Sequence, residues 1–206
     1  MINLLKMEFL VQKKFLKGLI LMIVFTTYIS LVSGGTQSIY LISTMIVFVL
    51  VLTTIEVEKR SNFNLCINSM PIKKSEYITA KYISALIYII SANMMFFIIF
   101  KGLNIILKNE MFYLDINSII LVISVQTLYM SIIIPIFIFL NRKYYRFANM
   151  LIIGGTAFIV GILSEENILI DLLSNTKSIT FLCIGSIIFI LSWLITNLIY
   201  EKRDVK

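Results

Sequence analysis

The chain has 206 residues, of which 59% are hydrophobic and 14% are charged, and its formal net charge is +7. Soluble domains average about 45–50% apolar and about 25% charged residues, so this composition indicates a single integral membrane domain. The chain contains no histidine, which excludes His-based catalytic triads, HExxH zinc sites and His proton shuttles.

The first segment, 1–17, carries apolar residues near helical spacing with four lysines between them. This pattern is typical of a basic amphipathic helix that lies in the membrane interface; a frayed cytoplasmic tail is the alternative. The lysines are spread through the segment and do not precede a short apolar core, so we do not interpret it as a cleavable signal peptide.

The rest of the chain is organised by six apolar runs, which lie at 18–33, 38–55, 82–100, 117–140, 147–163 and 178–200. A helix needs about 20 residues to cross about 30 Å of hydrocarbon, and we expect each run to form a transmembrane helix. The short polar connection at 34–37 predicts a tight hairpin of the first two. Pro135 is expected to kink the fourth helix without ending it.

The positions of the basic residues predict the orientation of these helices. With both termini in the cytoplasm, 15 of the 18 Lys and Arg residues lie on the cytoplasmic side, where membrane proteins concentrate them. These cytoplasmic parts are 1–17, 56–81, 141–146 and 201–206. The same asymmetry explains the positive charge, so no nucleic-acid partner is expected.

The predicted spans hold no charged residue near their centres, only uncharged polar side chains. Asn93 and Gln126 are the costliest of these to bury unpaired, and with Thr127 they are candidates for lining a translocation path. Hydrogen bonding between helices is the simpler alternative. Because ion-coupled transporters often use a carboxylate inside the membrane, the uncharged spans disfavour a secondary transporter.

Motifs for catalysis are missing from the sequence. The glycine pairs 34–35 and 154–155 are not followed by the lysine of a P-loop. Glu56 and Glu58 have no histidine partners for a metalloprotease, and Glu165 and Glu166 fit a solvated loop end. We therefore expect that the chain is not an enzyme and binds no cofactor or metal ion.

The longest polar segment between two apolar runs is 56–82, and Pro71 divides it. Proline disfavours a helix that runs straight through, so 61–69 is expected to form one short helix. Ser75 is expected to cap the next helix, with Glu76 in its first turn. Together they would form a rigid finger at the cytoplasmic face; the alternative is a simple amphipathic connector on the lipid surface.

This segment resembles a motif of the small six-span permeases of the ABC-2 type, the membrane halves of bacterial ABC exporters. In that family an acidic residue after the second span precedes a block similar to N-x-L-x-x-S-L-P-I-x-(K/R)-x-E-(Y/I)-x-x-x-K-Y. Here Glu56 and Glu58 are followed by NLCINSMPIKKSEY at 64–77 and by Lys81 and Tyr82. The spacing at the start of the block differs, and methionine replaces the usual leucine before the proline.

The resemblance implies an all-α polytopic membrane fold with an N-terminal interfacial helix, six transmembrane helices and a cytoplasmic coupling helix. That coupling helix would dock on a separate ATPase, which forms a dimer and hydrolyses the ATP. Carried over by position, the coupling residues are Glu56, Glu58, Phe63, Leu65, Ile67, Met70 and Pro71. The apolar turn within 164–177 resembles a re-entrant element of this fold.

The resemblance also implies partners and a location. Two six-span subunits, identical or homologous, would form the path in a bacterial cell membrane, in contact with lipid, and the expected cargo is an amphipathic peptide or antimicrobial compound. The alternatives are a non-transporting immunity or scaffold protein that binds its partner through the same loop, a secondary transporter, and a membrane enzyme. The sequence leaves open the substrate, the direction of transport and the identity of the second permease.

Overall fold

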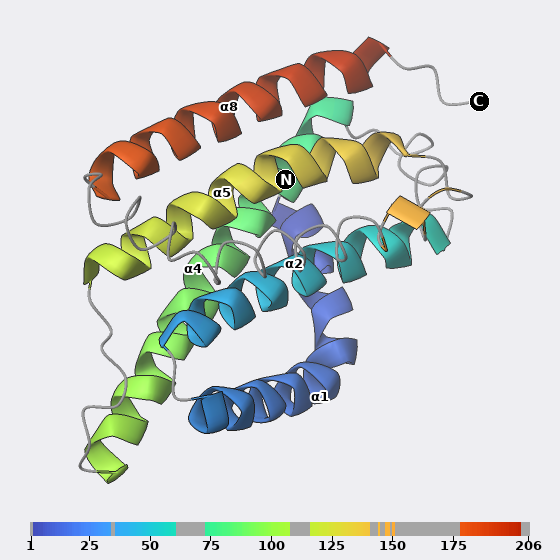
Figure 1. Ribbon diagram of the computed structural model, residues 1–206. Coiled ribbons are helices and arrows are strands. Elements are labelled where there is room, and N and C mark those ends of the chain that lie inside the picture. Colours follow the sequence, from blue (N-terminus) through green and yellow to red (C-terminus); the bar gives the residue numbers. More distant parts are fainter. Residues whose placement is uncertain are drawn as a thin grey trace.

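The computed structural model describes residues 2–33, 36–60, 73–107, 116–140, 144, 147, 148, 150 and 178–202 (Figure 1). Within these residues the regular structure is entirely helical, which confirms the all-α prediction for this part of the chain. The long helices are α1 (Ile2–Ser33), α2 (Thr36–Arg60), α4 (Lys74–Leu107), α5 (Ile116–Phe139) and α8 (Ser178–Lys202).

Three segments of the described chain are long and apolar enough to cross a membrane: Lys74–Ile105, Ile119–Phe139 and Ser178–Lys202. They correspond to the predicted third, fourth and sixth spans. The predicted first and second spans lie within α1 and α2, and that these helices cross the membrane stays a prediction. The predicted fifth span falls almost entirely outside the described residues, as does the predicted re-entrant element.

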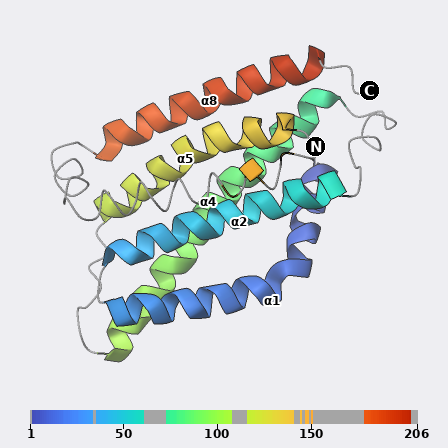
Figure 2. The ribbon, with the colours of Figure 1, turned by 45° about the vertical axis from the view of Figure 1, so that its right-hand side comes forward.

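Helix α1 joins two elements that the sequence predicts as separate. The expected interfacial helix, 1–17, and the first span, 18–33, form one continuous helix. No proline lies between them, and the single glycine there, Gly18, lowers helix stability by only about 1 kcal/mol. The N-terminal part nevertheless runs at a steep angle to the rest of α1 (Figure 2). Its position in the membrane interface stays a prediction.

Both ends of the polar segment are helical. Helix α2 continues five residues past the predicted end of the second span, and its last turn contains an ion pair of 2.5 Å between Glu56 and Arg60. Helix α4 begins at Lys74, so Ser75 is in its first turn and is not the residue before it. The Ser75 hydroxyl instead accepts a hydrogen bond of 3.0 Å from Asn197 of α8.

The ends of four helices come together at one end of the molecule. The N-terminal end of α1, the last turn of α2, the first turn of α4 and the C-terminal end of α8 lie together (Figure 2). We call this the loop end, because the segment 61–72 leaves and re-enters the described structure there. Helices α5 and α8 run in the same direction (Figure 1), as two spans separated by one further crossing would.

The core is built mainly from apolar side chains of α2, α4 and α5, with fewer from α8. Its largest fully buried apolar members are Phe48, Phe100, Phe137, Ile78, Ile89, Met130, Ile133, Ile134 and Val47. Aromatic pairs join the helices: the ring centroids of Phe48 and Tyr129 lie 5.6 Å apart, and those of Tyr82 and Phe189 lie 5.1 Å apart. Such pairs add to the energy of burial, so α2, α4, α5 and α8 form one packed unit.

Gly185 of α8 packs closely against α5. A Cβ at this position would lie 2.8 Å from Thr127 Oγ1 and 3.1 Å from the backbone oxygen of Ser124. Small residues at helix contacts allow close approach in membrane proteins. Helix α8 therefore needs a glycine here to pack on α5.

We predict that Gly185→Ala destabilises the protein by about 1–3 kcal/mol, the usual cost of overpacking. The matched control is Gly102→Ala on α4, where an added Cβ would meet nothing within 4 Å. It should be neutral or stabilising because alanine favours helix more than glycine does. Thermal unfolding of both variants in detergent measures the difference, and equal stabilities would contradict the prediction.

Candidate functional site

Three charged side chains from three helices meet in the interior at the loop end. Glu8 lies on α1, Glu58 on α2 and Lys81 on α4, and each residue is at least 96% buried. The Lys81 ammonium forms ion pairs with Glu8 Oε1 and, at 2.7 Å, with Glu58 Oε1. A buried charge is costly unless it is paired, so this single ammonium is what permits both carboxylates in the core. We call these residues the charge triad.

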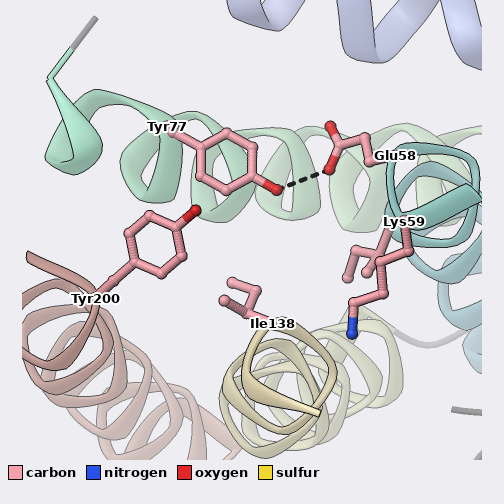
Figure 3. A pocket seen from close by; sticks show the side chains of 6 residues that line it. Glu58, Lys59, Tyr77, Ile138 and Tyr200 are labelled. Atoms are coloured by element: carbon pink, nitrogen blue, oxygen red, sulfur yellow. Dashed lines mark hydrogen bonds between the residues drawn. The ribbon is translucent and has the colours of Figure 1, made fainter. Parts of the chain in front are cut away.

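Tyr77 of α4 completes the surroundings of Glu58. Its hydroxyl donates a hydrogen bond of 2.8 Å to Glu58 Oε2 (Figure 3), so each oxygen of Glu58 has a partner. Burial is the largest influence on the Glu58 carboxyl and raises its pKa; Lys81 lowers the pKa, and the nearby Glu8 raises it. The net direction of the Glu58 pKa is upward, because burial outweighs the stabilising effect of Lys81.

Lys59, the neighbour of Glu58, points to a different helix. Its ammonium donates to the backbone oxygens of Phe137 and, at 2.5 Å, of Leu140. These carbonyls lie in the last turn of α5 and just past its end, where a cation is favoured by the helix dipole. Two consecutive residues of α2 therefore bind α4 and α5 (Figure 3).

The space between these side chains is a cavity of about 10 Å³ lined by Ile55, Glu58, Lys59, Tyr77, Ile138 and Tyr200. That is about the room that one water molecule needs, so no organic ligand fits it. Among the described residues, no group of three or more His, Cys, Asp or Glu side chains could hold a metal ion. The arrangement is suited to holding helices together.

A row of hydrogen bonds joins the first turns of α4 to α8. The Tyr82 hydroxyl lies 2.8 Å from that of Ser192 and 2.9 Å from that of Thr196. One turn earlier, the Trp193 indole donates to the Thr79 hydroxyl at 3.2 Å. With the Asn197 bond described above, α4 is attached to α8 over its first three turns.

The polar residues proposed from sequence to line a path form a network farther into the bundle. The Asn93 amide donates to Gln126 Oε1 at 2.6 Å, and the Gln126 amide donates to the Ser43 hydroxyl at 2.7 Å. Ser43 in turn donates to Asn93 Oδ1 at 3.2 Å, which closes a ring across α4, α5 and α2. Thr127 donates to the backbone oxygen of Ser124. The bonds of Asn93 and Gln126 are those of the interhelical alternative, whereas the bond of Thr127 lies within α5. A role of these residues in lining a path stays a prediction.

The predicted coupling residues divide into two groups. Glu56 and Glu58 are described, and they differ: Glu56 is partly exposed and pairs with Arg60 on its own helix, whereas Glu58 is buried in the charge triad. The remaining five lie outside the described residues: Phe63, Leu65, Ile67, Met70 and Pro71.

Sequence reasoning missed Glu8 and Lys81. Lys81 was counted as a cytoplasmic base, although it lies in the candidate span that begins at Lys74 and is 3% exposed. Glu8 had a signal: it is the only acid in 1–17, and Gln12 follows it by one turn. Both are buried, and the Gln12 amide donates to the backbone oxygen of Leu50 at 2.6 Å. This inner face of α1 is polar.

Comparison with known proteins identifies the family of the chain. A family model described as "ABC-2 family transporter protein" matches residues 3–201, which is nearly the whole chain. Comparisons with curated proteins and with solved structures gave no match. The match spans every described helix and both sides of the polar segment, and its name agrees with apolar helices long enough to cross a membrane. The chain therefore belongs to the ABC-2 transporter family, as a membrane permease component of an ABC transporter.

Proposed function

We propose that this permease is the membrane subunit of an ATP-driven exporter and that separate ATPase subunits drive it through the segment 61–72. The observation that carries the proposal is how the two helices next to that segment are joined. Glu58, near the end of α2, binds both Lys81 and Tyr77, near the start of α4. Since both helices are held together at the loop end, a partner that displaces the segment would act on the pair.

The ATPase has to come from another chain under this proposal. The sequence has no P-loop, so the permease supplies no nucleotide site of its own. An ATPase dimer would bind one coupling segment from each of two permeases, which are identical or homologous. The coupling residues would be those carried over from the family motif, with Phe63 and Ile67 as apolar anchors for a groove on the ATPase.

The loop end would face the cytoplasm of a bacterial cell. Most of the Lys and Arg residues fall in the segments assigned to that side, in accord with the rule for membrane loops. The placement of the N-terminal end of α1 and the C-terminal end of α8 at the loop end supports cytoplasmic termini (Figure 2). The proposed cargo, an amphipathic peptide or antimicrobial compound, rests on the resemblance to small exporter permeases.

The experiment that tests this function is co-purification of an ATPase with the permease from its native membrane. We predict that Phe63→Asp and Ile67→Asp each weaken the complex at least about tenfold, because a charge would replace an apolar side chain at the centre of an interface. Phe63→Leu is the control and should retain the complex, since it keeps an apolar side chain there. The readouts are the amount of ATPase retained and the export of cargo.

Two outcomes would reject the proposal. If both aspartate variants keep the complex and export intact, the segment is not the coupling element. If the permease binds its partner through the segment but no compound leaves the cell in an ATP-dependent manner, a non-transporting immunity or scaffold protein becomes the better description.

A further inference from the structure

We propose that Lys81 is a positioning residue, which by bridging Glu8 and Glu58 makes α1, α2 and α4 move as one unit when the segment 61–72 is displaced. This inference rests on the proposed function, because it assumes that an ATPase acts on that segment. It goes beyond that function by assigning roles to Glu8 and Lys81 and by including α1, which does not flank the segment.

The first argument is where the triad lies along the helices. Lys81 is two turns after the start of α4, and Glu58 is in the last turn of α2. A displacement of either helix end therefore reaches the triad within a few residues. The Lys81 ammonium also lies 5.6 Å from the centre of the Tyr77 ring, so the side chain is held between the aromatic ring and the two carboxylates.

The second argument is the chemistry of the link to α1. Glu8 Oε1 pairs with Lys81, whereas Glu8 Oε2 is buried and has no hydrogen-bond partner. If α1 did not follow α4, both oxygens of Glu8 would be buried without a partner. An unpaired buried charge is strongly disfavoured, so α1 is bound to the motion of α4 by electrostatics.

The third argument is that α1 makes a matching contact with α2. One turn after Glu8, the Gln12 amide donates to the backbone oxygen of Leu50 and to the Thr53 hydroxyl. Directly after Glu8, the Phe9 ring packs edge-on against Tyr88 of α4, with centroids 5.7 Å apart. The N-terminal part of α1 is thus attached to both helices that flank the segment, and Lys81 is where the two attachments meet.

The test measures the distance between α1 and α4 in the permease–ATPase complex. Spin labels are placed at the exposed positions Leu10 and Ile90, after Cys66 and Cys183 have been replaced by serine. Electron paramagnetic resonance gives the distribution of distances without nucleotide and after trapping with ATP and vanadate. In the otherwise unchanged protein we expect one narrow distribution that is the same in both states.

The variants then remove the link. In Lys81→Met the distribution should shift or broaden after trapping, relative to the same variant without nucleotide. Lys81→Arg keeps the charge and should restore the original result. The matched control is Lys101→Met, which makes the same change at an exposed position of the same helix and should behave like the unaltered protein.

Glu8→Gln provides a second route if Lys81→Met does not fold. It leaves the Glu58–Lys81 pair in place and removes only the charge that binds α1, and the same shift after trapping is expected. A distance that changes in the unaltered protein on trapping would overturn the inference, as would Lys81→Met or Glu8→Gln with a distribution that stays narrow. If no ATPase co-purifies with the unaltered permease, the proposed function itself has failed, which is a distinct result.

Discussion

Replacement of Lys81 by methionine is expected to lower the free energy of unfolding by about 3–5 kcal/mol, the range for removing one partner of a buried ion pair. Methionine has about the same length and fills the same space, so the loss would come from charge. Without the ammonium, Glu8 and Glu58 would be two buried carboxylates that repel each other. Their surroundings offer little help, since both are at least 96% buried.

The measurement is thermal or denaturant unfolding of the purified protein in detergent. Lys101→Met, an exposed change on the same helix, should stay within about 0.5 kcal/mol of the original stability, as surface substitutions usually do. The triple variant Glu8→Gln, Glu58→Gln, Lys81→Met should recover much of the loss, because it removes all three charges together. If the triple variant is no more stable than Lys81→Met alone, packing and not charge holds this site together.

Replacement of Gln126 by leucine is expected to lower the free energy of unfolding by about 2–3 kcal/mol. The Gln126 side chain accepts from Asn93 and donates to Ser43 and Thr44. Hydrogen bonds between transmembrane helices average about 0.6 kcal/mol each and reach about 1.7 kcal/mol. The loss of three bonds, with Asn93 left short of an acceptor in an apolar core, accounts for the expected size.

The control for Gln126→Leu is Val125→Leu, at the neighbouring position of α5, which is exposed on the outer surface. It should leave the stability unchanged within about 0.5 kcal/mol. Unfolding in detergent compares the two variants directly. Equal stability of Gln126→Leu and the unaltered protein would mean that the network contributes nothing to the fold, and a role for Gln126 in the translocation path would gain weight.

The long apolar helices could be predicted from sequence because hydrophobic length alone decides whether a segment can cross a membrane. The predicted spans at 117–140 and 178–200 agree with α5 and α8 to within two residues at each end. The predicted third span, 82–100, was too short at both ends. The polar residues before it are helical too, and Ser75 and Thr79 among them form hydrogen bonds with α8.

The charge triad could not be predicted, because it depends on contacts between residues far apart in the chain. Glu58 and Lys81 lie near opposite ends of the polar segment 56–82, and Glu8 precedes Glu58 by 50 positions. From local sequence patterns alone, charged residues near helix ends are expected to be exposed to solvent, where such residues are usually found. Only the packing of α1 against α2 and α4 shows that the two carboxylates share one ammonium inside the core.

The sequence pattern also did not predict how the bent N-terminal part of α1 packs. The four lysines and the apolar residues of 1–17 predict an interfacial helix with its polar face toward water. In the structure Leu4, Glu8 and Gln12 form the buried face, while Lys6 and Lys13 are exposed. The one signal of such a face, Glu8 followed one turn later by Gln12, is weaker than the pattern formed by the lysines and the apolar residues.

The order of the triad along the chain matters for biosynthesis. Glu8 and Glu58 are translated before Lys81, so the hairpin of α1 and α2 leaves the ribosome with two carboxylates whose counter-ion does not yet exist. Burying them at that stage would be costly, and the hairpin can reach its final packing only once α4 has been made. The ion pair thus makes the third long helix a requirement for the assembly of the first two.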